Sequence, residues 1–128
     1  MTNILVIDDN QDVTTMLETI LVSDTCSVQK AIGGRQGLQL LSKCQFDVVI
    51  TDIILPDFDG IELIMNINRM QPRPRVIVMT GGTKHLSLEY LYGVATALKV
   101  QRVLYKPFSI DVMLDSVFLR EDADRAAA

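Results

Sequence analysis

The sequence predicts one α/β domain built on an open, mostly parallel, doubly wound sheet with helices on both faces. Short runs of β-branched and other apolar residues alternate with longer stretches of helical periodicity, and this alternation occurs five times along the chain. Hydrophobic residues make up 48% of the 128 residues, which is enough for one packed core. A second independent core has no room in this length, so a single domain is expected.

Five strands are expected from the apolar runs. The first, third and fourth runs are almost wholly apolar, so they should be central strands that are covered on both faces. The second run mixes Ser27, Gln29 and Lys30 with apolar residues, and the fifth follows Gln101 and Arg102, so these two should be partly wetted edges. The runs span residues 4–7, 26–32, 48–51, 76–79 and 103–105.

The intervals between these runs carry apolar stripes at helical spacing. The stripe of the first helix follows the spacing i, i+3, i+4, i+7 and i+8 and consists of Val13, Met16, Leu17, Ile20 and Leu21. A second helix is expected after residues 33–34, and a third begins after Gly60 and ends before Pro72. A fourth covers residues 88–98, and Ser109 is the expected N-cap of a fifth.

The composition excludes several classes of function. The formal net charge is -4, from 12 Lys and Arg against 16 Asp and Glu, so direct nucleic-acid binding is not expected. The N-terminus lacks the features of a signal peptide, and no apolar run approaches the length of a membrane span. Cys26 and Cys44 are too few for a zinc site and are expected to be reduced structural thiols. We therefore expect a cytoplasmic protein with no part in a membrane.

A set of polar residues stands at the carboxyl ends of the predicted strands. Asp8 and Asp9 follow the first strand and Asp52 the third, while Thr80 follows the fourth and Lys106 the fifth. Each residue alone has a bland explanation, such as a helix cap, a turn residue or a solvated lysine. Ligands of doubly wound sheets bind outside the carboxyl ends of the strands. The joint placement therefore indicates a cation site next to an anion site.

The chemistry of this set favours a divalent metal ion and a phosphoryl group. Clustered carboxylates raise one another's pKa unless a cation lies among them, and carboxylate oxygens with water suit Mg²⁺. Lys106 would place a second positive charge beside an incoming phosphoryl group. Asp52, at the end of a central strand, is the candidate nucleophile that would form an aspartyl phosphate.

Four motifs carry a resemblance that covers residues 3 to about 119. They are Asp8-Asp9 after the first strand, Asp52 with Leu55-Pro56-Asp57 and Gly60 behind it, Val78-Met79-Thr80, and Tyr105-Lys106-Pro107-Phe108. Their joint spacing resembles the receiver domains of two-component response regulators, including the chemotaxis response regulator. The resemblance implies a flavodoxin-like strand order 2-1-3-4-5 and a receiver domain over residues 1–120. Residues 121–128, first polar and then small, would be a frayed tail or a linker stub.

The resemblance implies how the acidic residues divide their work. Asp52 would accept the phosphoryl group from the phosphohistidine of a sensor histidine kinase or a phosphotransfer protein. Asp9 and Asp52 would bind Mg²⁺ directly, and Asp8 would act mostly through water. The backbone carbonyl of Ile54 would complete the protein ligands of the metal.

The resemblance also implies how the phosphorylated domain would respond. Thr80 would bond a phosphoryl oxygen, and Lys106 would pair with the phosphate. The domain would then change conformation and control a partner or an output domain whose identity the sequence does not give. Such a domain is not an enzyme acting on other substrates, because it catalyses only its own phosphorylation and dephosphorylation.

Three positions depart from the family pattern. The family usually has Tyr or Phe three residues before the lysine, and here that position is Val103, so the usual aromatic switch is absent there. Ile54 and Gly82 occupy positions whose side chains tune hydrolysis of the aspartyl phosphate in the family. Neither can orient a water molecule by hydrogen bonding, so a long-lived phosphorylated form is expected.

Three alternatives share parts of this pattern. A haloacid-dehalogenase-like aspartyl-phosphate phosphatase also has a nucleophilic aspartate after a strand, but its acid/base residue stands two positions on, at Ile54 here. A flavodoxin-like electron carrier would need a Ser/Thr-rich phosphate loop after the first strand, where Asp8 and Asp9 would repel the FMN phosphate. A degenerate receiver used as a binding module would more often lack one of the key residues.

Overall fold

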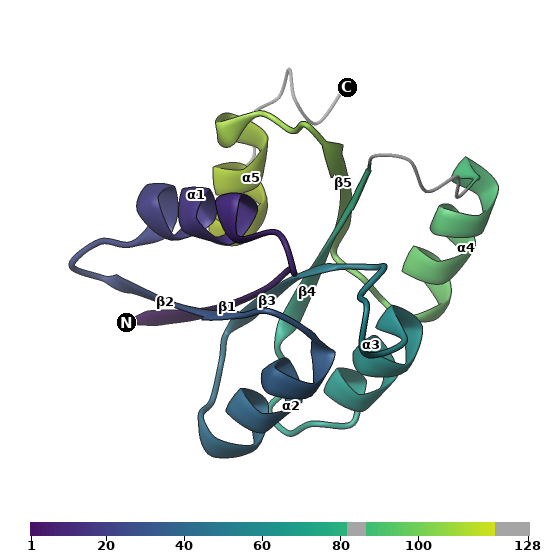
Figure 1. Cartoon of the computed structure of the whole chain (residues 1–128), viewed down its shortest axis with the longest axis horizontal. Coiled ribbons are helices and arrows are strands. Elements are labelled where there is room, and N and C mark those ends of the chain that lie inside the picture. Colours follow the sequence, from purple (N-terminus) through teal and green to yellow (C-terminus); the bar gives the residue numbers. More distant parts are fainter. Residues whose placement is uncertain (82–86, 120–128) are drawn as a thin grey trace.

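The computed structural model contains a parallel sheet between two layers of helices (Figure 1). It describes residues 1–81 and 87–119. The elements are β1 (Thr2–Ile7), α1 (Gln11–Leu21), β2 (Cys26–Ala31), α2 (Gly34–Lys43), β3 (Val48–Asp52), α3 (Gly60–Asn68), β4 (Arg75–Gly81), α4 (Leu88–Ala97), β5 (Arg102–Lys106) and α5 (Ile110–Phe118). The strict alternation of strands and helices confirms the predicted fold class.

The five strands lie in the order β2-β1-β3-β4-β5, and every neighbouring pair is parallel. β2 and β5 are therefore the edges and β1, β3 and β4 the centre, as the polarity of the runs predicts. The chain passes from β1 to β2 on one side and then returns to β3 on the other side. The carboxyl ends of β1 and β3 thus flank the point at which the winding direction changes, where doubly wound sheets bind their ligands.

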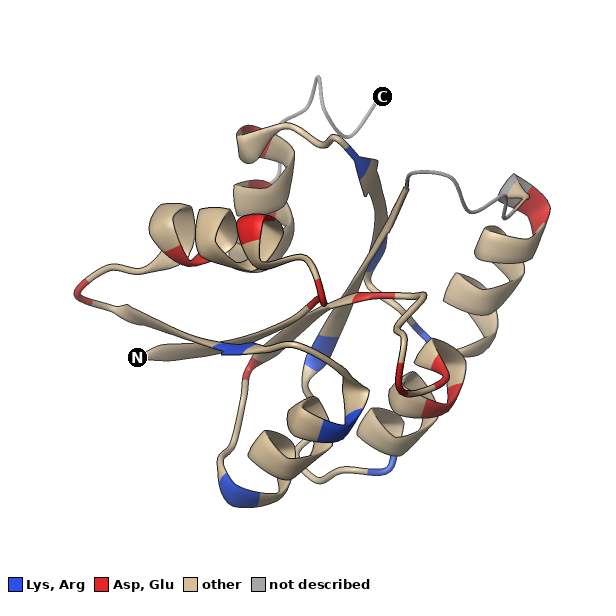
Figure 2. Cartoon of the chain, viewed as in Figure 1, with Lys and Arg blue, Asp and Glu red and all other residues tan. Residues whose placement is uncertain are grey.

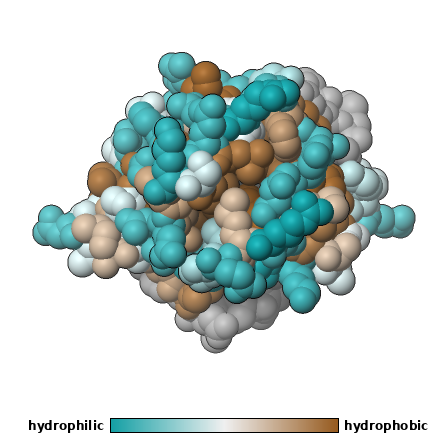
Figure 3. All heavy atoms as spheres, turned by 90° about the horizontal axis from the view of Figure 1, so that it is seen from below, coloured by the Kyte–Doolittle hydropathy of each residue, from teal (hydrophilic) through white to brown (hydrophobic). Residues whose placement is uncertain are grey.

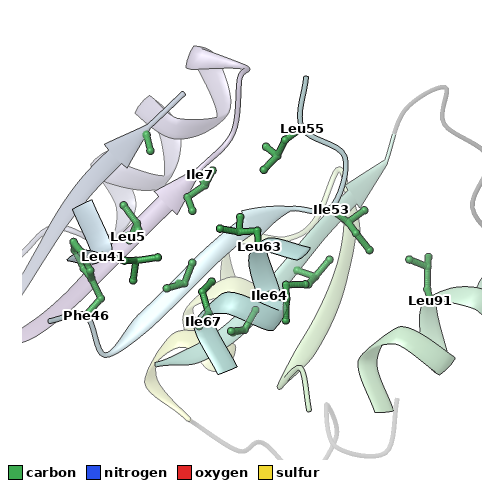
Figure 4. Packing of buried hydrophobic residues seen from close by; sticks show 14 residues of the cluster. Leu5, Ile7, Leu41, Phe46, Ile53, Leu55, Leu63, Ile64, Ile67 and Leu91 are labelled. Atoms are coloured by element: carbon green, nitrogen blue, oxygen red, sulfur yellow. The ribbon is translucent and has the colours of Figure 1, made fainter. Parts of the chain in front are cut away.

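Each face of the sheet has its own hydrophobic cluster. On one face α2, α3 and α4 pack on alternate strand residues, and labelled members of this cluster include Leu5, Ile7, Leu41, Leu63 and Leu91 (Figure 4). On the other face α1 and α5 pack on the strand residues between them, with Ile4, Val6, Leu17, Met113 and Val117 buried there. Because the central strands are held from both sides, their carboxyl ends form a fixed support for side chains.

The outer surface of the layer formed by α2 and α3 carries both hydrophobic and hydrophilic residues. Seen from below, where these two helices lie in Figure 1, hydrophobic residues show between hydrophilic ones (Figure 3). Partly buried residues of this layer, among them Leu38, Ile61 and Met70, pack against the cluster beneath them.

Most helices begin with a side-chain cap of their own. Asn10 accepts from the amide of Asp12 at the start of α1, and Asp59 caps α3 in the same way. Ser87 caps α4, and Ser109 caps α5 as predicted. The N-cap residue of α2 is Gly33, whose lack of a side chain leaves the first amides of that helix to another partner.

One expectation from the sequence is wrong, and others concern residues that the structure does not describe. Cys26 and Cys44 are both free thiols, but only Cys26 is buried, so the expectation of a second structural thiol is wrong for the exposed Cys44. Gly82 and the tail of residues 121–128 lie outside the described residues. In the described part of the chain, no helix has both the length and the apolar character needed to cross a membrane.

Candidate functional site

The predicted polar residues gather at the carboxyl edge of the sheet. Asp8 and Asp9 follow β1, Asp52 ends β3, Thr80 lies near the end of β4 and Lys106 ends β5. Oxygen atoms from the three aspartates all lie within 4.8 Å of one another. Figure 2 shows acidic residues at the carboxyl ends of β1 and β3, beside the strands that carry the other members.

Lys106 joins two of these aspartates. Its Nζ donates to Oδ2 of Asp8 at 2.7 Å and to Oδ2 of Asp52 at 2.9 Å. The lysine reaches them from the edge strand β5, across β4, because its register partner on β4, Gly81, presents no side chain. A Cβ at Gly81 would lie 2.7 Å from Cβ of Lys106, so a larger residue there would displace the lysine. The ammonium is thereby held between the ends of β1 and β3.

Backbone amides fix the other oxygen of each of these carboxylates. The amide of Asn10 donates to Oδ1 of Asp8 at 2.9 Å, and the amide of Ile54 donates to Oδ1 of Asp52 at 3.0 Å. Both donors lie two residues after their acceptor, in the turn that leaves the strand. Each carboxylate is therefore oriented by one amide and one ammonium, which favours a single conformation.

Burial and charge act against each other at Asp8. The residue is fully buried, and burial raises the pKa of its carboxyl group even though Lys106 and the amide of Asn10 favour the ionised form. Burial alone would lower the pKa of Lys106, but the hydrogen bonds that it donates to Asp8 and Asp52, together with their negative charges, outweigh burial and raise that pKa. The ammonium is thus kept charged beside the carboxylates.

The donor set fits a small divalent cation. Three carboxylates face one ammonium, so about two negative charges stay unbalanced when all of these groups are ionised. Their oxygens are hard ligands that converge within 4.8 Å, which is the chemistry that Mg²⁺ prefers. Asp9 is exposed and Asp52 half-buried, so water can complete the coordination.

Thr80 and Val103 lie on the side of the site toward β5. Thr80 is buried, stands one residue beyond the register partner of Asp52 and pairs with Tyr105. Val103 is partly buried against the core. Tyr105, on the same strand, is 46% exposed. No aromatic side chain therefore occupies the position at which the family usually has its switch residue.

Sequence reasoning missed the role of Asp57, which it took as part of the turn into the third helix. Its carboxylate accepts from the amides of Gly34 at 2.9 Å and Arg35 at 3.2 Å, at the start of α2. These bonds, that of Gly34 first, lower the pKa of Asp57. The available signal was the glycine pair at residues 33–34, which leaves a helix without a local cap.

Comparisons with known proteins agree with this geometry. The family described as Response regulator receiver domain matches residues 4–118. The response regulator ArlR of Staphylococcus haemolyticus is 33% identical over 78 residues, which are 61% of this chain and 36% of that protein. ArlR of Staphylococcus aureus is 28% identical over 115 residues, which are 89% of this chain and 50% of that protein. The chain thus spans half or less of the length of these relatives.

Solved structures share the fold over nearly the whole chain. A CheY-like response regulator receiver domain protein from Methanospirillum hungatei aligns with a TM-score of 0.83 at 23% identity, covering 100% of this chain and 99% of that one. The response regulator DrrB of Thermotoga maritima aligns with a TM-score of 0.76 at 25% identity, covering 89% of this chain and 49% of that one.

An acidic cluster bridged by a lysine thus lies at the switch point of a five-stranded parallel sheet, where doubly wound domains bind their ligands. The family match over residues 4–118 makes the assignment specific. The chain belongs to the response regulator receiver domains of two-component systems.

Proposed function

We propose that this receiver domain accepts a phosphoryl group on Asp52 from a sensor histidine kinase or a phosphotransfer protein, with Mg²⁺ as cofactor. The observation that carries the proposal is the pair of bonds from Lys106 to Asp8 and Asp52 at the edge where three carboxylates converge. Asp8, Asp9, Asp52 and the backbone carbonyl of Ile54 would hold the metal. Bound there, Mg²⁺ would neutralise part of the charge on the incoming phosphoryl group.

The chain's own residues account for the transfer step. A carboxylate oxygen of Asp52 forms a bond to phosphorus, and the bond from phosphorus to the donor histidine nitrogen breaks. The nitrogen leaves with the electron pair, so no oxidant or reductant is needed. Since the amide of Ile54 and the ammonium of Lys106 already orient Asp52, little reorganisation precedes the attack.

Phosphorylation would change the partners of two residues. Lys106 would pair with the phosphoryl oxygens, and the hydroxyl of the buried Thr80 would donate to one of them. Because Val103 has no ring to move between core and solvent, we assign the conformational response to Thr80 and α4. The response would act on a partner or an output domain, consistent with relatives that are longer than this chain.

We propose that the domain works in the cytoplasm. It would act as a phosphoacceptor and not as an enzyme with external substrates. A haloacid-dehalogenase-like phosphatase would need an acid/base residue at the position of Ile54, whose side chain is aliphatic and packs against the core. The net charge of -4 gives no reason to expect direct nucleic-acid binding by this domain.

The test is labelling with a small acyl phosphate such as acetyl phosphate. In the presence of Mg²⁺ the intact mass should rise by one phosphoryl group. This rise in mass should be absent in excess chelator and absent in the Asp52→Asn variant. Asp24→Asn serves as the matched control, since it makes the same substitution at an exposed carboxylate outside the site and should still be labelled. Full labelling of Asp52→Asn, or labelling in excess chelator, contradicts the proposal.

A further inference from the structure

The start of α2 is capped from another part of the chain. Its N-cap residue, Gly33, makes no side-chain bond. The carboxylate of Asp57, in the loop between β3 and α3, accepts instead from the amides of Gly34 and Arg35. The contact joins segments more than 20 residues apart and takes the place of a local cap.

The two segments fit closely. A Cβ at Gly33 would lie 2.6 Å from Oδ1 of Asp57, and a Cβ at Gly34 would lie 2.6 Å from Cβ of Phe58. Both approaches are closer than real Cβ contacts allow, so glycine at these positions lets the loop lie directly on the helix start. The tip of the loop is thus seated on α2 by charge-assisted hydrogen bonds and by close packing.

The base of the same loop holds the phosphoacceptor. The amide of Ile54 donates to Oδ1 of Asp52, and Ile54 pairs with Asp59 across the loop. Gly60 packs so tightly on the carbonyl of Ile53 that a Cβ there would collide with its oxygen. Residues 53–60 are therefore closed at the base, and their free end is the tip that carries Asp57.

We propose that Asp57 is a positioning residue for Asp52, acting through the loop that it anchors to α2. The inference rests on the proposed phosphoacceptor function and adds to it a residue that touches neither metal nor phosphoryl group. Without the anchor, the loop spends less time in the conformation that points the Ile54 amide at Asp52 and presents the Ile54 carbonyl. Metal binding and phosphoryl transfer both weaken in proportion to that lost population.

A cap swap separates this role from helix stability. Asp57→Ala removes the anchor and the cap together. Gly33→Asp combined with Asp57→Ala restores a local cap, because Gly33 has extended backbone that any residue adopts and the removed carboxylate vacates the space for its Cβ. The swap variant therefore has a capped α2 without the anchor. Asp24→Ala, which removes an exposed carboxylate outside the loop and the site, controls for charge.

The measurements are urea unfolding, Mg²⁺ titration, the rate of labelling by acetyl phosphate, and hydrogen exchange of the Ile54 amide. We expect the swap variant to recover wild-type stability and yet to bind Mg²⁺ roughly tenfold more weakly, with slower labelling at saturating donor. Its Ile54 amide should exchange roughly tenfold faster. Asp24→Ala should match the wild type in all four measurements.

Each outcome decides the question. If the swap variant matches the wild type in Mg²⁺ affinity, labelling and Ile54 exchange, Asp57 is merely a helix cap and the inference is wrong. If the wild type itself neither binds Mg²⁺ nor is labelled, the proposed function fails, and the Ile54 exchange still tests the anchor. If Asp57→Ala does not fold, the swap variant decides alone.

Discussion

Asp8 shows at the scale of a single residue how function opposes stability. Its carboxylate is fully buried, and burial raises its pKa above the ordinary value of 3.8 despite the bond from Lys106. Ionised Asp8 therefore costs folding free energy in the absence of a metal. The proposed cation site would carry this cost whenever the cation is absent.

Asp8→Asn should stabilise the metal-free domain by about 1 kcal/mol at pH 7. The amide keeps the shape of the side chain and an oxygen for the Asn10 amide, but it has no charge to bury. The measurement is urea unfolding in chelator. Addition of Mg²⁺ should narrow the difference, because only the wild type has the full set of carboxylates.

The same substitution has a pH dependence of known sign. A raised native pKa means that native Asp8 binds its proton at a higher pH than the unfolded chain does. As the pH falls from 7 toward 3.8, wild-type Asp8 becomes neutral in the native state and its penalty disappears. The advantage of the Asn variant should shrink over that window, and an advantage that grows instead would contradict the assignment.

Ile54 is a second residue at which one property of the side chain, the lack of a hydrogen-bonding group, leads to a prediction. It stands two residues after Asp52, is partly buried and cannot bond a water molecule. Ile54→Asn should shorten the lifetime of the phosphorylated form by about tenfold, because an amide can orient an attacking water. The lifetime is read from the loss of the phosphoryl mass after the donor is removed, with Ile54→Val as the aliphatic control. If the phosphorylated forms of the Asn and Val variants decay at the same rate, the side chain at position 54 does not control hydrolysis.

Two helices are fastened at their C-terminal ends by one short segment. The Arg73 side chain donates to the carbonyls of Leu98 and Lys99 at the end of α4, at 3.2 and 2.6 Å. Arg75, two residues on, donates to the carbonyls of Ser116 and Val117 at the end of α5. The segment before and at the start of β4 thus caps a helix on each face of the sheet, where cationic side chains stabilise helix ends.

Arg73→Met should lower the free energy of unfolding by about 1 kcal/mol and speed amide exchange in the last turn of α4. The aliphatic part of the side chain is retained, so the change removes the guanidinium with its bonds to the Leu98 and Lys99 carbonyls and to the side chain of Asn68. Arg69→Met, an exposed substitution of the same charge, is the control and should change stability by less than about 0.5 kcal/mol. Unchanged exchange at the end of α4 would show that the guanidinium does not hold it.

At the scale of the whole molecule, the two hydrophobic clusters and the five strands found in residues 1–81 and 87–119 all lie within residues 2–117. A chain that ends at residue 120 should therefore unfold with the same free energy as the full chain, within about 0.5 kcal/mol. Urea unfolding of the two chains checks the proposed domain boundary. A loss of stability well above that range would place part of the tail in the folded domain.

Local patterns sufficed to predict the fold class and the meeting of polar residues at one edge of the sheet, whereas the strand order was an implication of the family resemblance. Strand polarity identified the edges, and the rule that parallel strands end on one edge brought Asp8, Asp52 and Lys106 together although they lie far apart in sequence. The bond of Asp57 to α2 and the arginine caps depend on how loops from separate units meet. No period or turn preference encodes such meetings, so they become visible only in three dimensions.

The arginine caps hold the C-terminal ends of α4 and α5, so each helix would tilt about that end. α4 and α5 are tied at the ends far from Lys106, while their N-terminal ends lie toward the carboxyl edge of the sheet. A 10-residue helix is about 15 Å long, so a shift of about 1 Å at its N-terminal end becomes a rotation of roughly 4°. A displacement near Thr80 would thus tilt α4 without sliding it, which orientation-dependent NMR couplings would record as a change in the direction of its axis.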